Sequence, residues 1–299
     1  GQRSFRHILG RAIWDHVPRP DNEFRPLPLP KPERNQACSC GSGVKFKHCC
    51  QPMAPLAKAL DGFSLLRYVL ELYPTKEFKE LPFAHLNPEE VAHVASEWFH
   101  AGDAKRAEAL LQPLLADFSK LDARHAAAFW LLLDCYDALD NPRKKQKLIE
   151  AALRAPDRQL AGDAAQRLAT ILSDRGDYEG AWRLFADAQR LNPDDPSHAH
   201  LEIMLLVGQG QKARAAERAK FWIARLSRQG SEHAELISFL RSVTGDAAGA
   251  MLDIAAIATP AFARLKELLD HLPGVVSHYQ LAVQDGSAGP LKPDRALAA

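Results

Sequence analysis

The chain has 299 residues, of which 46% are hydrophobic and 25% charged, and its 38 Lys and Arg residues nearly balance its 37 Asp and Glu residues. These proportions are ordinary for a globular protein, so they exclude a collagen-like chain, a wholly disordered chain and a strong polyelectrolyte. The sequence contains neither an apolar run near the ~20 residues that span a bilayer nor a signal-peptide core, and a cytoplasmic protein is expected.

Charge is unevenly distributed along the sequence. The first 50 residues hold nine Lys and Arg against four Asp and Glu, a net charge of +5, whereas the remainder holds 29 against 33, a net charge of −4. A basic segment of this kind favours an acidic partner. The alternative interpretation, which charge alone does not exclude, is that this uneven distribution has no function.

Residues 1–16 are expected to form an amphipathic helix, because Phe5, Ile8, Leu9 and Ile13 recur at helical spacing. Such a short helix is marginal by itself, so we expect it either to pack on the body of the protein or to act as a free binding helix. Residues 17–33 follow as a linker with prolines at positions 18, 20, 26, 28, 30 and 32. This spacing predicts an extended, semi-rigid polyproline II strut.

Four of the five cysteines, Cys38, Cys40, Cys49 and Cys50, lie within thirteen positions. Two short-loop disulfides are one interpretation, but a reducing compartment disfavours them. Four thiolates close a tetrahedral site around Zn²⁺, whose binding free energy folds segments that have little core of their own. His48 stays open as a competing fourth ligand. Four protein ligands leave no position for water or substrate, so we expect a structural rather than a catalytic metal.

The residues around these cysteines form a recognisable pattern. In order, they are Arg34-Asn35, the run from Cys38 to Gly43, Lys45-Phe46-Lys47, and Cys49-Cys50. This pattern resembles the SEC-C motif, the zinc knuckle at the C-terminus of the protein-export ATPase SecA; Ala37 departs from it, because the family generally has proline there. The resemblance implies that the metal is zinc, with iron a less common proposal, and that its ligands are Cys38, Cys40, Cys49 and Cys50.

The expected zinc knuckle, residues 34–52, carries a cluster of cations. Lys45 and Lys47 flank Phe46, and Arg34 precedes them. Cations beside an aromatic ring bind acidic protein, RNA or phosphate. The alternative interpretation is that these lysines only keep the knuckle soluble. The SEC-C resemblance favours docking, since the SecA knuckle binds a chaperone and approaches ribosomes.

The rest of the chain is expected to be helical, without a convincing strand pattern. Residues 53–87 are expected to form connecting helices, residues 88–273 an array of helical repeats, and residues 274–299 an irregular C-terminal segment. The predicted fold class is therefore all-α, a helical-repeat superhelix preceded by a small four-cysteine zinc knuckle on a proline-rich linker.

A repeat is visible in the spacing of glycines. Gly210 follows Gly176 after 34 positions, and Gly245 follows after a further 35. Because Gly102 precedes Gly176 by 74 positions, the intervening unit, about 124–156, is expected to be irregular. The period and the small residues near it resemble the tetratricopeptide repeat.

A tetratricopeptide-like array implies a superhelix whose first helices line a concave groove. The groove positions expected to bind a partner are Phe99, Gln166, Thr170, His200 and Met204. A helix or an extended peptide with apolar anchors fits this set. A superhelix that serves as a spacer or self-associates is the alternative.

The sequence contains none of the common catalytic motifs for hydrolysis, phosphate binding or dinucleotide binding, so we do not expect an enzyme. The expected function is that of a bacterial, cytoplasmic, zinc-containing adaptor that binds protein or peptide partners, among them an acidic chaperone or the ribosome. Neither a membrane span nor a small-molecule substrate is expected. Two alternatives are a ribosome- or RNA-associated factor and the non-catalytic N-terminal half of a longer enzyme.

Overall fold

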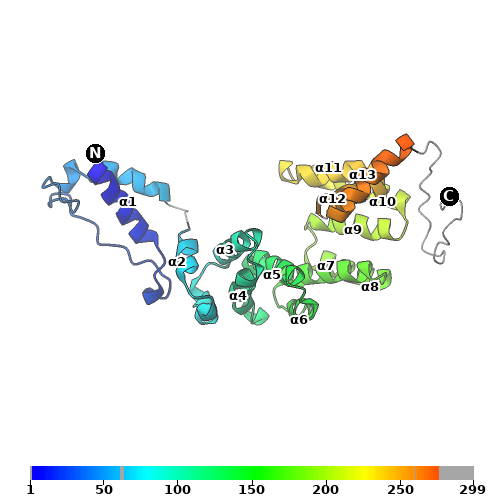
Figure 1. Ribbon diagram of the computed structural model, residues 1–299, viewed down its shortest axis with the longest axis horizontal. Helices are drawn as coiled ribbons and strands as arrows, with labels where there is room; N and C mark the ends of the chain where they lie inside the picture. The colour runs from blue at the N-terminus through cyan, green and yellow to red at the C-terminus, as the bar shows by residue number, and fades with distance from the viewer. Residues whose placement is uncertain (1, 61–63, 259, 276–299) are drawn as a thin grey trace. The chain divides into compact units, whose positions relative to one another are not determined.

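A computed structural model describes residues 2–60, 64–258 and 260–275. The described residues form helices and connecting turns without a strand, apart from two isolated β-bridges (Figure 1). The chain divides into two compact units, residues 1–164 and 165–299, which are described separately below. The irregular segment expected at 274–299 lies almost wholly outside the described residues. None of the described helices is both long and apolar enough to cross a membrane.

Unit 1 begins with helix α1 (Gln2–His16), which packs on the 3-10 helix η3 (Gln51–Leu60). Two further 3-10 turns lie between them, η1 (Pro20–Asn22) and η2 (Phe46–His48). Helix α2 (Leu66–Leu72) follows, with the turns η4 (Thr75–Glu80) and η5 (Phe83–His85). The remaining elements are α3 (Pro88–His100), α4 (Ala104–Leu114), η6 (Phe118–Lys120), η7 (Ala123–His125), α5 (Ala126–Ala138) and α6 (Pro142–Ala152).

The proline-rich segment is not a free strut. Its residues 26–33 have no regular secondary structure, and they run back along α1. Arg11 of α1 donates hydrogen bonds to the carbonyl oxygens of Leu29 and Pro30, both at 2.6 Å, and Asp15 accepts one from the amide of Leu29 at 2.8 Å. Proline removes backbone donors and leaves carbonyl acceptors, so a guanidinium with several N–H groups is a suitable partner for this segment.

The segment reverses at a tight turn. Glu23 and Phe24 both adopt positive φ angles, 55° and 59°. Phe24 is buried, and its ring lies edge-on to Tyr73 with centroids 5.5 Å apart. The proline-rich segment therefore contacts both α1 and the connecting helices, which corrects the expectation of a spacer between separate modules.

The α3–α6 part of unit 1 is an array in which α3 packs on α4, α4 on α5 and α5 on α6. Asn87 and Asp103 cap α3 and α4 by accepting backbone hydrogen bonds. The rings of Phe78 and Trp98 stack 5.8 Å apart, and the Arg106 guanidinium lies 4.2 Å from the Trp98 ring. Aromatic and cationic groups thus fix the start of the array to the connecting helices.

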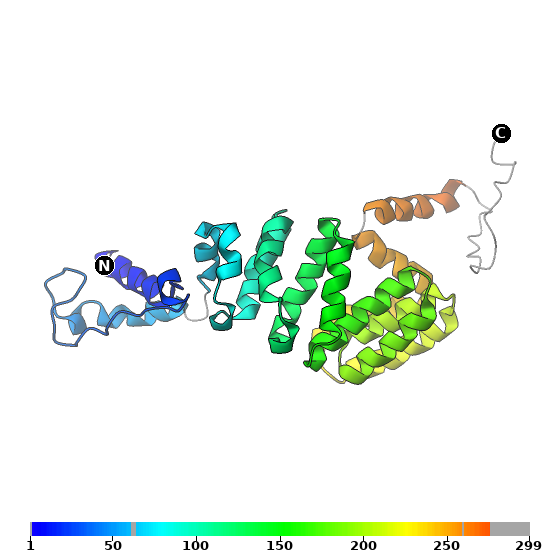
Figure 2. The same ribbon diagram turned by 90° about the horizontal axis from the view of Figure 1, so that it is seen from below.

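Unit 2 is likewise built of α-helices joined by short turns (Figure 2). Its elements are α7 (Arg158–Asp174), whose first turns belong to unit 1, α8 (Tyr178–Leu191), α9 (Ser197–Gly208), α10 (Lys212–Leu226), η8 (Ser231–His233), α11 (Ala234–Gly245), α12 (Ala247–Ala258) and α13 (Pro260–Val275). From α8 onward, each α-helix packs on the next. Helical structure therefore extends two residues beyond the expected limit at 273.

Unit 2 buries one carboxylate in its core. Glu202 of α9 accepts two hydrogen bonds from Arg218, at 2.7 and 2.9 Å, and one from the Trp222 indole at 2.6 Å. Its charge is paired and its oxygens are satisfied, which is what burial of a carboxylate requires. The network fixes α9 against α10 around the fully buried Trp222 ring.

The turns inside the helix pairs explain the spacing of Gly102, Gly176 and Gly210, whereas Gly245 is the last residue of α11 and does not have a positive φ. Gly102, Gly176 and Gly210 each follow the first helix of a pair with positive φ, at 90°, 81° and 72°. Asp140 occupies the same place between α5 and α6, with φ of 53°. The 74-residue interval therefore contains two helix pairs, with turn spacings of 38 and 36. The unit at 124–156, which we expected to be irregular, is a helix pair, α5 and α6, whose left-handed turn residue is not glycine and whose turn spacings depart from 34.

We predict that Asp140→Gly stabilises the protein by roughly 0.5–1 kcal/mol, because glycine adopts positive φ without the steric penalty of a side chain. Ala138→Gly, two residues earlier and still within α5, is the matched control and should destabilise by a similar amount. Urea denaturation of both variants measures the free energies of unfolding. Equal destabilisation by the two substitutions would contradict the assignment of Asp140 as a strained turn residue.

Candidate metal centre

The first two cysteines lie on a short hairpin-like loop. An isolated antiparallel bridge joins Ala37 to Lys45, and the amide of Cys38 donates to the carbonyl of Val44 at 2.8 Å. Between these residues the chain turns through Gly41 and Gly43, whose φ angles are +74° and +73°. Residues other than glycine rarely adopt this backbone conformation, so the two glycines allow the turn.

Among the described contacts, the amide of Gly41 does not donate to a sulfur. The amide of Gly41 instead donates to the carbonyl oxygen of Cys38 at 3.1 Å. The contacts that the structure gives to sulfur come from hydroxyl groups. The glycines therefore shape the turn without supplying a described hydrogen bond to a thiolate.

The second pair of cysteines lies at the junction of two 3-10 helices. Helix η2 is held to the loop by hydrogen bonds from the amide of Phe46 to the carbonyl of Gln36, at 2.9 Å, and from Lys47 to Arg34, at 3.1 Å. Cys49 ends η2 with φ −120° and ψ −87°, and η3 begins one residue after Cys50. This bend brings two adjacent sulfurs to one centre.

The four sulfur atoms converge. The Sγ atoms of Cys38, Cys40, Cys49 and Cys50 all lie within 4.8 Å of one another, and none of these cysteines forms a disulfide. The Cys40 and Cys49 sulfurs are 3.4 Å apart. Zn–S bonds of ~2.3 Å in a tetrahedron place sulfurs ~3.8 Å apart. The donor set and its spacing therefore fit a four-thiolate zinc site.

His48, the competing fourth ligand, is exposed and lies outside the sulfur cluster. Because η2 ends between His48 and Cys50, Cys50 is the residue that reaches the centre, and it is fully buried there. The geometry favours four thiolates over three thiolates and an imidazole.

Hydroxyl groups surround the Cys49 sulfur. Ser42 Oγ lies 3.1 Å from it and Ser4 Oγ of α1 lies 3.7 Å away. Hydrogen bonding by Ser42 lowers the pKa of Cys40 to about 6, whereas burial raises the pKa of Cys50. A divalent cation at the centre favours the thiolate form of all four groups.

Helix α1 forms part of the metal centre. Ile8 is buried against Cys38, Cys40 and Cys50. The Arg3 guanidinium donates to the Gly41 carbonyl at 3.4 Å, and a nitrogen of His7 lies 2.9 Å from the Ser39 hydroxyl. From the sequence we expected α1 either to pack on the body of the protein or to be a free binding helix. In the structure it packs on the cysteine loop. Its helical periodicity was the available signal, but periodicity does not identify the partner of a helix.

The cationic cluster lies on the outer side of the loop. Arg34 and Lys45 are exposed and Lys47 is half-buried. Phe46 is not a free ring, because it is half-buried and packs against the cysteine cluster together with Met53. Lys45 and Lys47 are therefore the sequence neighbours of a ring that supports the loop.

The five expected groove residues lie in both units, Phe99 in unit 1 and the others in unit 2. Phe99 is half-buried beside His100, with ring centroids 5.7 Å apart. The hydroxyl of Ser197 donates to the side-chain oxygen of Gln166 at 2.9 Å, and Thr170 donates to the Gln166 carbonyl at 3.2 Å. These polar groups are engaged within their own units.

The remaining two groove residues also pack internally. The His200 ring lies 5.3 Å from the Phe239 ring, and burial lowers the pKa of His200. Met204 packs against a buried cluster formed by α7, α8 and α9. Their side chains contribute to the packing of unit 2, and each is half-buried.

Comparison with known proteins gives one match, to the family model described as the SEC-C motif, over residues 34–52. These residues include the four cysteines and the cationic cluster. Among curated proteins and solved structures, none matches the chain. The motif and the sulfur cluster together fit a zinc-binding domain.

We predict that the purified full chain holds about one zinc ion, because four thiolates satisfy one tetrahedral ion. Cys49→Ser should lose it, whereas His48→Ala should retain it. Elemental analysis of zinc and iron together with a free-thiol assay measures this directly. Metal-free protein with two disulfides would contradict the metal centre, and zinc loss in His48→Ala would contradict the ligand assignment.

We predict that Ile8→Asp lowers zinc affinity by about 10- to 100-fold, the range typical for residues that support metal ligands, because a buried carboxylate displaces α1 from the cysteines. Ile13→Asp is the matched control, since Ile13 lies on the same helix and is 42% exposed. Competition with a chromogenic chelator gives both affinities. Equal affinities in the two variants would show that α1 does not support the site.

Proposed function

We propose that the protein is a zinc-containing interaction adaptor whose cysteine loop serves as a docking surface. The observation that carries this proposal is a closed cluster of four sulfurs within a segment that also carries three cations, the exposed Arg34 and Lys45 and the half-buried Lys47. Four thiolates complete the coordination of zinc, so the ion has no position for a substrate. Its role is to hold the loop and its cations in shape.

Docking to an acidic protein is supported by charge. The first 50 residues carry a net charge of +5 in a chain whose total is +1. The side chains of Arg34, Lys45 and Lys47 have no hydrogen-bond or ion-pair partner within the described part of the chain, although their backbone groups are hydrogen-bonded. Such cations accelerate encounter with an acidic surface and add orientation. An acidic chaperone is one partner of this kind.

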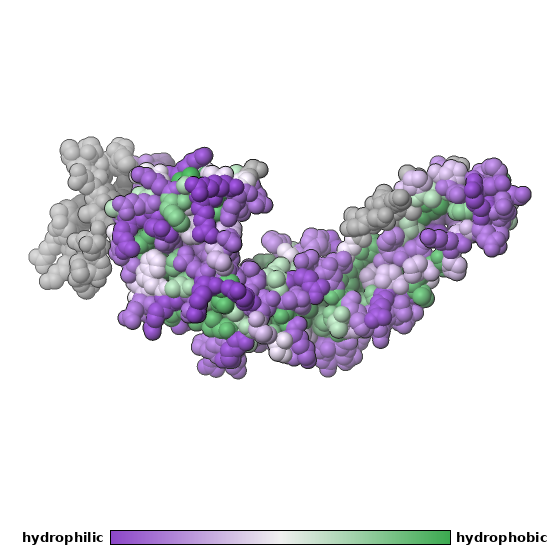
Figure 3. Space-filling view, turned by 180° about the vertical axis from the view of Figure 1, so that it is seen from behind, coloured by the Kyte–Doolittle hydropathy of each residue, from purple (hydrophilic) through white to green (hydrophobic). Residues whose placement is uncertain are grey.

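The helical array provides the second half of the proposal. Left-handed turn residues at spacings of 38, 36 and 34 support tetratricopeptide-like repeats, which present partner-binding surfaces. Hydrophobic patches interrupt the mainly hydrophilic surface in Figure 3. Choice of partner then depends on the array, with the half-buried Phe99 as a candidate anchor, while the cysteine loop supplies docking. We propose no catalytic activity for these residues; in a longer enzyme they would be its docking part.

We predict that Lys45→Glu/Lys47→Glu abolishes capture of acidic proteins by the immobilised full chain from a bacterial lysate, because it replaces attraction by repulsion. Lys76→Glu/Lys79→Glu is the matched control, since both lysines are exposed on η4. Quantitative mass spectrometry at low and high salt, with and without ribonuclease, measures capture. Thermal unfolding of the helical array should be unchanged in both variants.

Two outcomes would contradict the adaptor. Capture that disappears after ribonuclease treatment, with a steep dependence on salt, would assign the cations to RNA or the ribosome. Identical capture by the loop variant, the control and the original protein would show that the cations have no docking role.

A further inference from the structure

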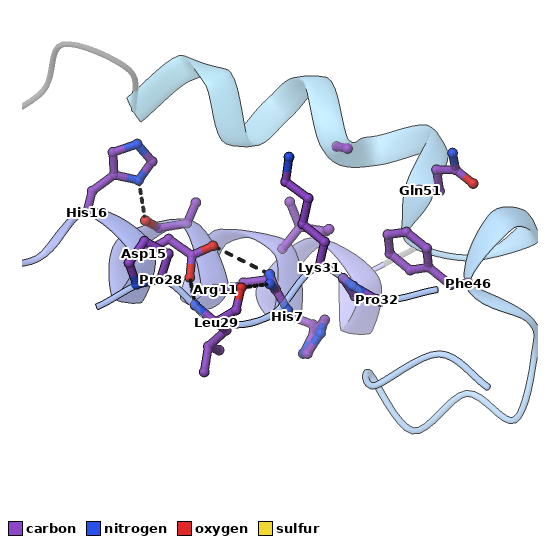
Figure 4. A pocket seen from close by; sticks show the side chains of 13 residues that line it. His7, Arg11, Asp15, His16, Pro28, Leu29, Lys31, Pro32, Phe46 and Gln51 are labelled. Carbon is purple, nitrogen blue, oxygen red and sulfur yellow. Dashed lines mark hydrogen bonds and ion pairs between the residues drawn. The ribbon is translucent and has the colours of Figure 1, made fainter. Parts of the chain in front are cut away.

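A cavity of about 450 Å³ lies beside the metal centre, between α1, the proline-rich segment and the start of η3 (Figure 4). Its size falls within the roughly 300–1,000 Å³ of typical ligand pockets. It lies mostly outside residues 34–52, the part of the chain that the SEC-C model matches. We call it the α1 pocket.

The walls of the α1 pocket are mainly apolar. They come from four parts of unit 1: α1, the proline segment, the ring of Phe46 and η3. The apolar lining residues are Ile8, Ala12, Pro28, Leu29, Pro32, Phe46 and Ala54. Prolines and a packed aromatic ring lose little conformational freedom on binding, so the pocket is largely preformed.

The charged groups of the pocket differ in how they are engaged. Arg11 and Asp15 form an ion pair at 3.5 Å and also hold the proline segment through the hydrogen bonds already described. His7 and His16 have polar neighbours, the Ser39 hydroxyl and the Ala12 carbonyl. Lys31 is exposed, and among the described residues it has no hydrogen-bond or ion-pair partner. Its side chain extends from the proline segment toward η3 in Figure 4.

We propose that the α1 pocket binds a short peptide segment of an acidic protein, in which a large apolar side chain packs against Phe46 and a neighbouring carboxylate pairs with Lys31. The proposal rests on the adaptor function and names the chemistry of its partner. Apolar burial supplies affinity, and a single unpaired ammonium at the edge of the pocket supplies orientation.

The proline segment offers a bound peptide little backbone hydrogen bonding, because Pro28 and Pro32 have no N–H and the amide of Leu29 already donates to Asp15. Recognition therefore depends on side chains, an apolar anchor followed by an acid. Lys31 belongs to the same basic segment of net charge +5 that attracts an acidic partner.

Fluorescence anisotropy of the zinc-loaded full chain with a labelled peptide tests the proposal. The probe is Ser-Gly-Ser-Leu-Phe-Glu-Ser-Gly-Ser, compared with one peptide in which Gln replaces Glu and one in which Ser-Ser replaces Leu-Phe. The first peptide should bind at least tenfold more tightly than either of the others. Lys31→Glu should weaken its binding at least tenfold.

Ala54→Trp should abolish binding, because Ala54 is exposed at the pocket wall and an indole there fills the cavity. The matched control, Ala101→Trp, places the same side chain at an exposed position after α3. Zinc content and circular dichroism establish that each variant is folded. Lys31→Glu, a change at an exposed side chain, keeps the test decisive if Ala54→Trp fails to fold.

Three results would overturn the proposal: absence of saturable peptide binding, equal binding of all three peptides, or binding unchanged by both pocket variants. Displacement of the peptide by sodium octanoate at a lower concentration than the unlabelled peptide requires would instead assign the pocket to a small amphiphilic carboxylate. The Lys45→Glu/Lys47→Glu variant separates the two proposals. If this variant still binds the peptide but no longer captures proteins from the lysate, both proposals are supported. If the original protein captures acidic proteins but does not bind the peptide, the pocket proposal is wrong and the adaptor proposal stands.

Discussion

The arrangement of the first 60 residues depends on one constraint, the convergence of four cysteine sulfurs within 4.8 Å. Four thiolates this close repel one another strongly unless a cation neutralises them. The hairpin-like loop, the bend at Cys49 and the cover provided by Ile8 all serve that convergence. Because the segment has few other buried residues, its folding is linked to metal binding. Every surface that the loop forms therefore depends on metal binding as well.

The helical array depends on a different constraint, the need to reverse the chain between paired helices. At four of these reversals a left-handed residue lets the second helix return along the first. Gly102, Gly176 and Gly210 made three of these turns predictable from sequence. The fourth turn could not be found from the positions of glycines, because its left-handed residue is Asp140 and aspartate also adopts positive φ.

The candidate site could be predicted in part. Cys38 and the other three cysteines are close in sequence, so the donor set follows from local spacing, and the same holds for Lys45 and Lys47. The position of α1 could not be predicted, because the contact of Ile8 with the cysteines joins residues about 30 positions apart and depends on tertiary packing. The course of the proline segment could not be predicted either, because the hydrogen bonds of Arg11 that hold it along α1 require the fold.

Phe46 connects the metal centre to the α1 pocket. Its ring packs on the cysteine cluster and also lines the cavity, so the bound metal and a bound peptide stabilise the same conformation of the loop. Two ligands that favour one conformation must strengthen each other's binding, and by the same factor. The metal is then more than a remote fold element: through Phe46, its occupancy sets the fraction of molecules whose pocket is formed, and hence the apparent affinity for a partner.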